Sequence, residues 1–552
     1  MLLGYVSDER YMAIADALVE VERNGQSVAV VRSSPRGAIH ADLTPGDYRV
    51  TLAKDGFGAK SVTVSADPAN PHQFRLLTDR LLGYMWPKWC RAGERSEFRV
   101  HSVEPCRLTL WRYGWQKEFV RMIGWHDEHG PRAAMQITPD GDYTQTGVQW
   151  NRQGYGNPHH SQLVTGPDRS GLYYVHAEGE WSGAFFSFPW IVAPRRPQAP
   201  IAVLASNFTW NAYNSFGGRS NYINADRLPD RPIVNARLDL PRYTESGAFN
   251  VWAAPDAAYA PLSFERPEIG NHVPAEMQVT DPIRGRLACG MAPAEWRLLG
   301  WLEREGHPYD LYAETQLDDG LLDLDAYRVL VLGVHPEYWT RRMYTSVKAW
   351  VEERGGRLMY LGGNGLNCEV ERLDAATMRC KTQLLSVGGE LGMHDPQDPG
   401  IYFESRMHRT LESEASLLGV VTTHTGIMTG APYQVRAAAH WSFAGTGLQD
   451  GDVFGAGSLQ ERVPGGASGH ETDKMSPSSP PGSALLAKGL NPEGGGAEIV
   501  YRETPSGGAV FSVGSITYVA SMPVDPAVSR VTANVLGRML AGGPDGALPS
   551  AS

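Results

Sequence analysis

A histidine and a glutamate stand two residues apart directly after a short apolar run. The run is "VLVLGV", residues 329–334, and His335, Pro336 and Glu337 follow it. An imidazole titrates near neutral pH and can transfer protons, while a carboxylate is a hard oxygen ligand for a metal ion. This pair, placed where a buried strand leaves the core, therefore indicates proton transfer or metal binding at the end of that strand.

From residue 200 onward, short apolar strands alternate with helices. "IAVLAS", "YDLYAETQ", "VLVLGV" and "RLMYLGGN" are typical of extended, mostly buried segments, whereas "PAEWRLLGWLEREGH" and "MYTSVKAWVEERGG" have apolar residues at helical spacing. Such alternation predicts an α/β domain with a mostly parallel sheet covered by helices. Ligands of such sheets bind outside the carboxyl ends of the strands.

Three loops are therefore expected to open on the same face of the sheet. They carry, in turn, His335 with Glu337, Asn207 with Tyr213 and Asn214, and the "GGNG" turn with Asn364. The glycines of the third loop also fit a tight strand-to-helix turn, with the site lined by backbone.

Nucleophilic and phosphate-binding chemistry are poorly supported. No GxSxG elbow occurs, and a class I glutaminase-like sheet would need a cysteine at the turn that carries Asn364. Cys368 lies further on, beside Glu369, whose charge disfavours a thiolate. "GGNGLN" lacks the lysine of a P-loop. Metal-assisted hydrolysis remains, and carboxylate and phenolate oxygens suit iron(III) better than zinc.

The residues before 198 predict two all-β units. Residues 1–78 alternate apolar and polar positions between turns, as in a small sandwich, and "DLTPGDYRVTLAKDGF" resembles the transthyretin-like fold of carboxypeptidase-regulatory-like modules. Residues 79–197 continue as a second sandwich that ends in a Pro-rich linker. We expect a class I glutaminase-like α/β domain over 198–542, containing a mobile Gly/Pro/Ser-rich loop over 462–496, and a disordered tail over 543–552.

Histidine-rich loops in the second β unit are alternative metal ligands. "WHDEHG" contains His126 and His129, and "NPHHSQ" contains His159 and His160. The first is not a helical HExxH motif, because its histidines are three apart and glycines flank it. We therefore expect solvated loops here, lining at most the rim of a neighbouring site.

Composition restricts the partners. The 552 residues carry a net charge of -11, which argues against a basic surface for nucleic acid. No apolar run approaches the roughly 18 residues of a membrane span, and the N-terminus has no secretion-signal pattern. The 5 cysteines lack CxxC spacing, which fits a reducing compartment. We expect a cytoplasmic protein without nucleic-acid or membrane partners.

A series of sequence blocks occurs in a fixed order along the chain. The blocks are "NFTWNAYNSFGGRSNY", "LSFERP", "EWRLLGWLEREGHPYDLY", "VLVLGVHPEYWTRRMYTSVKAWVEERGGRLMYLGGNG", "HWSFAGTGLQDGDVFG" and "VFSVGSITYVASM". This series resembles the large (beta) subunit of N,N-dimethylformamidase and its relatives. The resemblance implies a mononuclear iron held by two tyrosines and a glutamate, with a histidine two residues before the glutamate. The N-terminal module departs from the family pattern, and a small subunit is not evident in one chain.

Carried over to this sequence, the resemblance implies Glu337 as an iron ligand and His335 as its catalytic neighbour. Tyr213, in "NAYN", is the first phenolate. Tyr259, just before "LSFERP", is the expected second, with Tyr243 and Tyr222 as alternatives. The expected substrate pocket consists of aromatic and amide side chains near these ligands: Asn207, Phe208, Trp210, Asn214, Phe264 and Asn364.

The expected function is hydrolysis of the carbon–nitrogen bond of a small N-substituted amide such as a formamide. Iron(III) would polarise the carbonyl group or activate water, and His335 would give a proton to the leaving amine. We also expect a homo-oligomer. The alternative is a carbohydrate- or peptide-binding protein with a metal-free α/β domain, since β modules often precede such domains in binding proteins.

Overall fold

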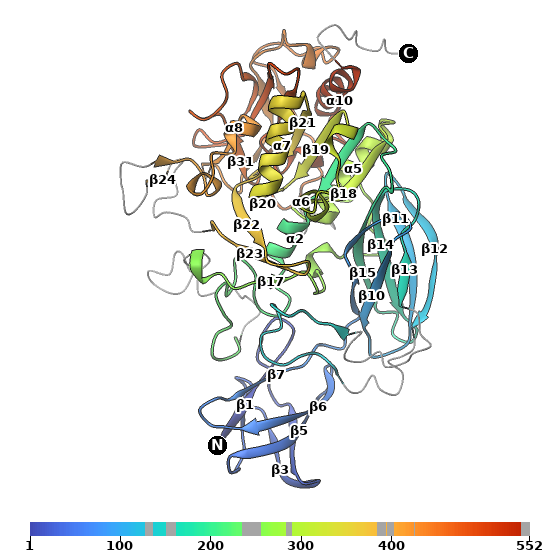
Figure 1. Ribbon diagram of the computed structural model, residues 1–552, viewed down its shortest axis with the longest axis vertical. Helices are drawn as coiled ribbons and strands as arrows, with labels where there is room; N and C mark the ends of the chain where they lie inside the picture. The colour runs from blue at the N-terminus through green and yellow to red at the C-terminus, as the bar shows by residue number, and fades with distance from the viewer. Residues whose placement is uncertain are drawn as a thin grey trace.

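The structure, a computed structural model, describes residues 1–126, 136–150, 162–234, 256–282, 290–383, 393–394, 402–423 and 425–542. Sheets dominate it and helices are few (Figure 1). The N-terminal sheets form one end of the molecule, and the largest sheet and most of the helices form the other. Within the described ranges, the helices are too short or too polar to cross a bilayer.

Two sheets form the N-terminal module, with strand orders β4-β1-β7 and β3-β2-β5-β6. The strands are β1 (Leu2–Ser7), β2 (Leu18–Arg23), β3 (Gln26–Arg32), β4 (Ala38–His40), β5 (Gly46–Lys54), β6 (Gly58–Ala66) and β7 (His72–Arg75). Alternate residues of β5, namely Tyr48, Val50 and Leu52, are buried in one shared core. This is the result of the period-two pattern, and the predicted all-β character is confirmed.

The second β unit also has two sheets, with orders β13-β10-β8 and β12-β11-β14-β15-β9. Its strands are β8 (Leu82–Trp86), β9 (Trp89–Arg91), β10 (Arg95–His101), β11 (Cys106–Tyr113), β12 (Lys117–His126), β13 (Leu163–Thr165), β14 (Gly171–Gly179) and β15 (Phe185–Ala193). Tyr84, Trp150 and Trp190 fill the core between the sheets. The predicted boundaries between the units stay predictions.

The largest sheet has the order β18-β16-β19-β21-β34-β33-β32-β28-β29. Its strands are β16 (Ile201–Ala205), β18 (Tyr309–Ala313), β19 (Val329–Val334), β21 (Arg357–Gly362), β28 (Tyr433–Val435), β29 (Val453–Phe454), β32 (Ala484–Gly489), β33 (Glu498–Glu503) and β34 (Ala509–Ser512). The strands from β18 to β34 pair in parallel, whereas the others pair antiparallel. The sheet is therefore mixed, and the likeness to class I glutaminases stays a prediction.

Helices accompany the parallel strands, as the alternating pattern predicts. They are α2 (Asn207–Tyr213), α5 (Ala292–Arg304), α6 (Glu314–Asp318), α7 (Arg341–Arg354), α8 (Ala415–Leu418), α9 (Tyr518–Ser521) and α10 (Pro526–Ala541). In α7, the N-cap side chain of Thr340 accepts from the N–H of Met343, and Gly355 ends the helix with φ 76°. Its buried residues, Val347, Trp350 and Val351, recur at helical spacing.

Shorter strands complete the part around the largest sheet. β17 (Leu262–Ser263), β23 (Thr377–Cys380), β22 (Cys368–Arg372) and β20 (Tyr338–Thr340) form one sheet in that order. Further pairs are β24 (Met393–His394) with β25 (Tyr402–Phe403), β26 (Val421–Thr423) with β31 (Thr472–Lys474), and β27 (Gly430–Ala431) with β30 (Ser468–Gly469).

The Gly/Pro/Ser-rich segment over 462–496 contains β30, β31 and β32. The prediction of a mobile loop is therefore wrong for these parts, because long-range strand pairing overrides the local composition. The predicted tail over 543–552 lies outside the described residues.

Candidate metal centre

His335 and Glu337 leave the core through a strained turn at the end of β19. All residues of β19 are buried, and its last residue, Val334, has φ 62°. This left-handed conformation is unfavourable for a β-branched residue. The N–H of His335 donates to the carbonyl oxygen of Gly333 at 2.8 Å, so the chain makes a γ-turn here. Strain of this kind collects at functional sites.

Two phenols converge on the carboxylate of Glu337, which is fully buried. The hydroxyl of Tyr213, at the end of α2, donates to Glu337 Oε2 at 2.8 Å. The hydroxyl of Tyr222 lies 3.1 Å from the same oxygen and 2.8 Å from Oε1. The two phenol oxygens are 3.0 Å apart. Burial and the negative charge of Glu337 raise the pKa of both tyrosines well above the usual value.

His335 lies between Glu337 and a second carboxylate, Glu471. Its Nε2 is 3.2 Å from an oxygen of each. Burial lowers the pKa of His335, but its hydrogen bonds and charge interactions with both carboxylates outweigh this and raise it to about 10. The amide of Asn364 donates to Glu471 at 2.8 Å and lies 3.5 Å from His335 Nε2. Both carboxylates therefore orient the imidazole through the same ring nitrogen.

Arg406 and Cys368 contact the other oxygen of Glu337. The Arg406 guanidinium donates to Oε1 at 3.0 Å and lies 3.3 Å from the sulfur of Cys368. Burial raises the pKa of the Cys368 thiol well above its usual value, which agrees with the sequence argument against a cysteine nucleophile. Arg406 thus places a positive charge at Oε1, which Tyr222 also contacts, while Oε2 contacts Tyr213 and His335.

A family model described as "N,N-dimethylformamidase beta subunit-like, C-terminal" matches residues 107–530, which is most of the chain. The chain belongs to this family.

Two curated relatives in this family are N,N-dimethylformamidase beta subunits. The protein of Paracoccus aminophilus is 30% identical over 291 residues, 44% of this chain and 36% of that protein. The protein of an Alcaligenes species is 29% identical over 295 residues, 45% of this chain and 37% of that protein. The alignments thus span little more than a third of the relatives' length.

A solved structure of fibronectin(III)-like modules from Clostridium thermocellum is 11% identical. The match covers 36% of this chain and 93% of the solved chain, with a TM-score of 0.12. A similarity this low carries no argument about the fold.

In this dimethylformamidase-like protein, the side chains around Glu337 include Tyr222, which the sequence analysis kept as an alternative. In the described part of the chain, the phenols that reach Glu337 belong to Tyr213 and Tyr222. Tyr259, the preferred residue, is buried in the core after the 3-10 helix over Asp256–Ala258. The remaining alternative, Tyr243, lies outside the described residues.

Most residues predicted for the substrate pocket are buried and have partners in the core, and their role in substrate binding stays a prediction. These residues are Asn207, Phe208, Trp210, Asn214 and Phe264. For example, the indole of Trp210 donates to Glu295 at 2.9 Å, and the amide of Asn214 donates to the carbonyl oxygen of Pro267 at 3.0 Å. Asn364, by contrast, lies beside His335 and donates to Glu471.

Sequence reasoning missed Glu471 and Arg406. Glu471 follows His470, a non-glycine residue with φ 65°, inside the segment predicted as a loop. Arg406 precedes the 3-10 helix over Met407–Arg409. The same segment also contains Arg462, Asp473, Lys474, Lys488 and Glu493, so charge alone could not have singled out Glu471.

The histidine loops do not form a metal site that the structure describes. His126, at the end of β12, packs edge to face on Phe98 with ring centroids 5.4 Å apart, while His129, His159 and His160 lie outside the described residues. Among described residues, no group of three or more His, Cys, Asp or Glu is arranged to hold a metal ion. Tyrosine is not one of these four residue types, so this finding does not bear on the phenol oxygens at Glu337.

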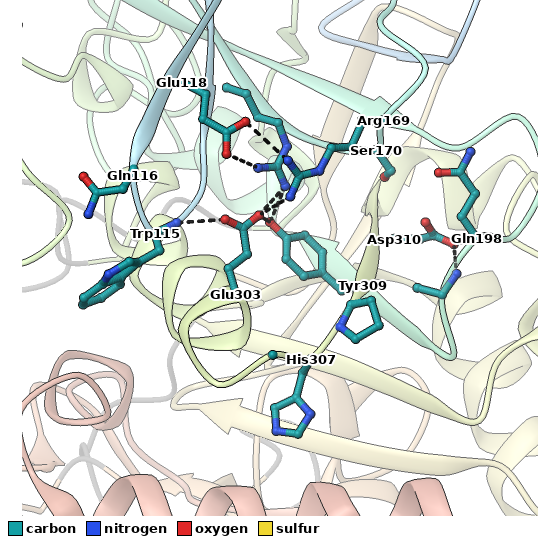
Figure 2. A pocket seen from close by; sticks show the side chains of 14 residues that line it. Trp115, Gln116, Glu118, Arg169, Ser170, Gln198, Glu303, His307, Tyr309 and Asp310 are labelled. Atoms are coloured by element: carbon teal, nitrogen blue, oxygen red, sulfur yellow. Dashed lines mark hydrogen bonds and ion pairs between the residues drawn. The ribbon is translucent and has the colours of Figure 1, made fainter.

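A polar hollow of about 530 Å³ lies between the second β unit and α5 with β18 (Figure 2). Its walls carry Arg112, Arg169, Glu118 and Glu303, which form a network of ion pairs. The predicted site residues do not line it. The hollow therefore marks the junction between two parts of the chain.

Proposed function

We propose that this protein is an iron-dependent amidohydrolase that cleaves the carbon–nitrogen bond of a small N-substituted amide such as a formamide. The observation that carries the proposal is the triangle of oxygens formed by Glu337 Oε2 and the hydroxyls of Tyr213 and Tyr222. The family names of the relatives, which are N,N-dimethylformamidases, support the choice of an amide as substrate.

The spacing and charge of these oxygens fit a trivalent ion. Three oxygens about 2.0 Å from one ion and at right angles lie roughly 2.8 Å from one another. The edges of the triangle measure 2.8, 3.0 and 3.1 Å. One carboxylate and two phenolates would carry three negative charges, which balance iron(III). Hard anionic oxygens are also the ligands that such an ion prefers.

Glu337, Tyr213 and Tyr222 would hold the metal, which as a Lewis acid polarises the amide carbonyl and lowers the pKa of water. His335, beside Glu337, would give a proton to the nitrogen of the leaving amine. Glu471 and Asn364 orient its imidazole. Hydrolysis adds the elements of water across the bond, so that a carboxylate and an amine leave.

The assembly stays a prediction. The relatives are named as beta subunits, which supports association with other chains. We propose a homo-oligomer. β12, at the edge of its sheet, exposes Phe119, Met122 and Trp125, and exposed apolar edges favour such contacts.

An assay of amide hydrolysis tests the proposed function. The iron-loaded protein should release dimethylamine and formate from N,N-dimethylformamide, and Glu337→Gln should lower the rate at least roughly 10²-fold, since metal catalysis supplies several kcal/mol. Glu369→Gln is the matched control, because this buried glutamate pairs with Arg341 instead. An inactive wild-type protein with formamides and acetamides, or a fully active Glu337→Gln variant, would refute the proposal.

A further inference from the structure

The N-terminal module touches the segment that joins the two tyrosines. We call residues 213–222 the tyrosine loop, because Tyr213 opens it and Tyr222 closes it. At its tip, the backbone N–H of Gly217 donates to the carbonyl oxygen of Glu9 at 2.6 Å. Glu9 follows β1, which pairs with β7 on the side of the module nearest the rest of the chain (Figure 1).

Arg75, the last residue of β7, joins separate segments through one buried guanidinium with 0% exposure. It donates to the carbonyl oxygens of Gly217 at 3.1 and 3.2 Å, Asp8 at 2.8 and 3.2 Å, and Gly141 at 3.0 Å. It also lies over the ring of Tyr143, 4.6 Å from the centroid. Because guanidinium donors form a rigid planar fork, these bonds fix the loop tip relative to the module.

The tip packs without free space against Tyr11 of the module and against Thr144, outside the module. Gly217 and Gly218 have φ values of 98° and 96°, which favour glycine. A Cβ atom at Gly218 would lie 2.5 Å from Cβ of Tyr11, and one at Gly217 would lie 2.5 Å from Cγ2 of Thr144. Tyr11 is itself anchored, since its hydroxyl donates to the carbonyl oxygen of Pro229 at 2.7 Å. A shift of Tyr11 would therefore displace the tip.

The two ends of the tyrosine loop are held from the other side. Arg266 donates to the carbonyl oxygens of Phe216 at 2.6 Å and Asn214 at 3.2 Å. The N–H of Asn221 donates to the carbonyl oxygen of Ala212, in α2, at 2.9 Å. Arg266 also donates to the carbonyl oxygen of Arg219 at 3.4 Å. These bonds hold the loop before and after its tip, while Gly217 and Gly218 themselves contact the N-terminal module and residues near Tyr143.

We propose that the N-terminal module is a structural part of the metal centre, with Arg75 as a positioning residue that fixes the tyrosine loop and so the separation of the Tyr213 and Tyr222 phenol oxygens. The consequence for the metal rests on the proposed iron function, whereas the hold on the loop concerns the protein alone. This role differs from that of a tethered binding module, which would leave the loop unaffected when its contacts are removed.

Hydrogen exchange and ferric-iron titration of the full chain test this role. In the metal-free protein, Arg75→Met should speed exchange of the Gly217 amide and its neighbours in the tyrosine loop. In the titration, it should weaken iron binding by roughly 10- to 100-fold, the usual loss when supports of metal ligands are removed. The tyrosinate-to-iron(III) band should also shift. Arg75→Lys should restore part of each property.

Lys60→Met is the matched control. Lys60 is equally buried, with 3% exposure, and donates to the carbonyl oxygen of Arg75 at 3.1 Å and to Asp140 at 2.5 Å. It crosses the same junction without a bond to the tyrosine loop. Lys60→Met should lower the free energy of unfolding. Hydrogen exchange of the tyrosine loop and the tyrosinate-to-iron(III) band should stay close to those of the wild type.

The outcomes separate this role from the iron proposal. Equal effects of Arg75→Met and Lys60→Met on loop exchange would overturn the positioning role. Faster loop exchange specific to Arg75→Met, in a wild-type protein that binds no iron, would support the hold on the loop and refute the iron proposal. If Arg75→Met does not fold, Tyr11→Phe is used in its place. Tyr11→Phe should speed exchange of the tyrosine loop in the same direction but to a smaller extent. Unchanged loop exchange in Tyr11→Phe would overturn the positioning role.

Discussion

His335 contacts Glu337 and Glu471. It is not among the residues proposed to hold iron, whose ligand atoms are all oxygens. His335→Ala should therefore keep its iron and visible colour while slowing amide hydrolysis by about 10²- to 10⁴-fold, the usual contribution of a general acid or base. Parallel measurement of kcat and iron content checks this. His307→Ala, on the hollow beside α5, should keep both properties. Loss of iron in His335→Ala would show that the imidazole is needed for binding.

At the scale of residues, the loops after strand ends and the family resemblance indicated His335, Glu337 and Tyr213, which lie together in the structure. The spacing from a strand end determines where these side chains emerge, and strand ends are visible in the sequence. Tyr222 could not be chosen over Tyr259 in this way. That choice depends on the turn at Gly217 and Gly218, and so on packing against a distant module.

Glu295, in α5, makes the stability depend on pH. Burial raises its pKa from 4.5 to about 8, although Trp210 and Ser206 donate to it. A carboxyl group whose pKa is higher in the folded than in the unfolded protein stabilises the fold at a pH below its unfolded pKa. This contribution is lost as the pH rises to the folded pKa. Wild-type stability should therefore fall between about pH 4.5 and pH 8, and Glu295→Gln should lack that part of the fall.

Urea unfolding at pH 5 and pH 8 measures the difference between Glu295→Gln and the wild type. The variant should gain relative stability at the higher pH, by roughly 1 kcal/mol or more. Glu353→Gln, an exposed position on α7, is the control and should show no such gain. The same pH dependence in all three proteins would contradict the burial effect.

At the scale of elements, the parallel strands and the helices α5 and α7 follow from periodicity, caps and glycine stops. The γ-turn at Val334 does not, because nothing in a valine favours positive φ. β32, within the Gly/Pro/Ser-rich segment, was also missed. Its pairing with β28 joins segments more than 50 residues apart, so a local window of sequence carries little sign of it.

At the scale of the whole molecule, Glu303 links α5 to the second β unit (Figure 2). It pairs with the buried Arg112 and accepts from the N–H of Trp115 at 2.9 Å. Burial alone would raise the pKa of Glu303, but these donors hold it below the usual value. Glu303→Gln should lower the free energy of unfolding by about 3–5 kcal/mol, because the buried Arg112 then keeps only the longer pair with the more exposed Glu118.

Glu118→Gln is the comparison for Glu303→Gln. Glu118 also pairs with Arg112, at 3.7 Å, but its side chain is 47% exposed, so the loss should stay below about 1 kcal/mol. Unfolding in urea at neutral pH measures both. Similar losses in the two variants would show that the buried link does not hold the two parts together.

The domain order could be predicted from composition and period, because sandwich strands and α/β units differ in pattern. The contacts between the units could not. They depend on buried groups such as Arg75, whose donors are satisfied by carbonyl oxygens far along the chain, and a sequence pattern does not show such partners.

Iron binding by Glu337, Tyr213 and Tyr222 is tested most directly by metal analysis with visible spectroscopy of Tyr222→Phe. The wild-type protein should hold a single iron and show a tyrosinate-to-iron(III) band. Tyr222→Phe should lose or strongly shift that band and bind iron more weakly, because a phenyl ring cannot coordinate, while Tyr259→Phe should match the wild type. An unchanged band and full iron content in Tyr222→Phe, or loss of both in Tyr259→Phe instead, would contradict the assignment.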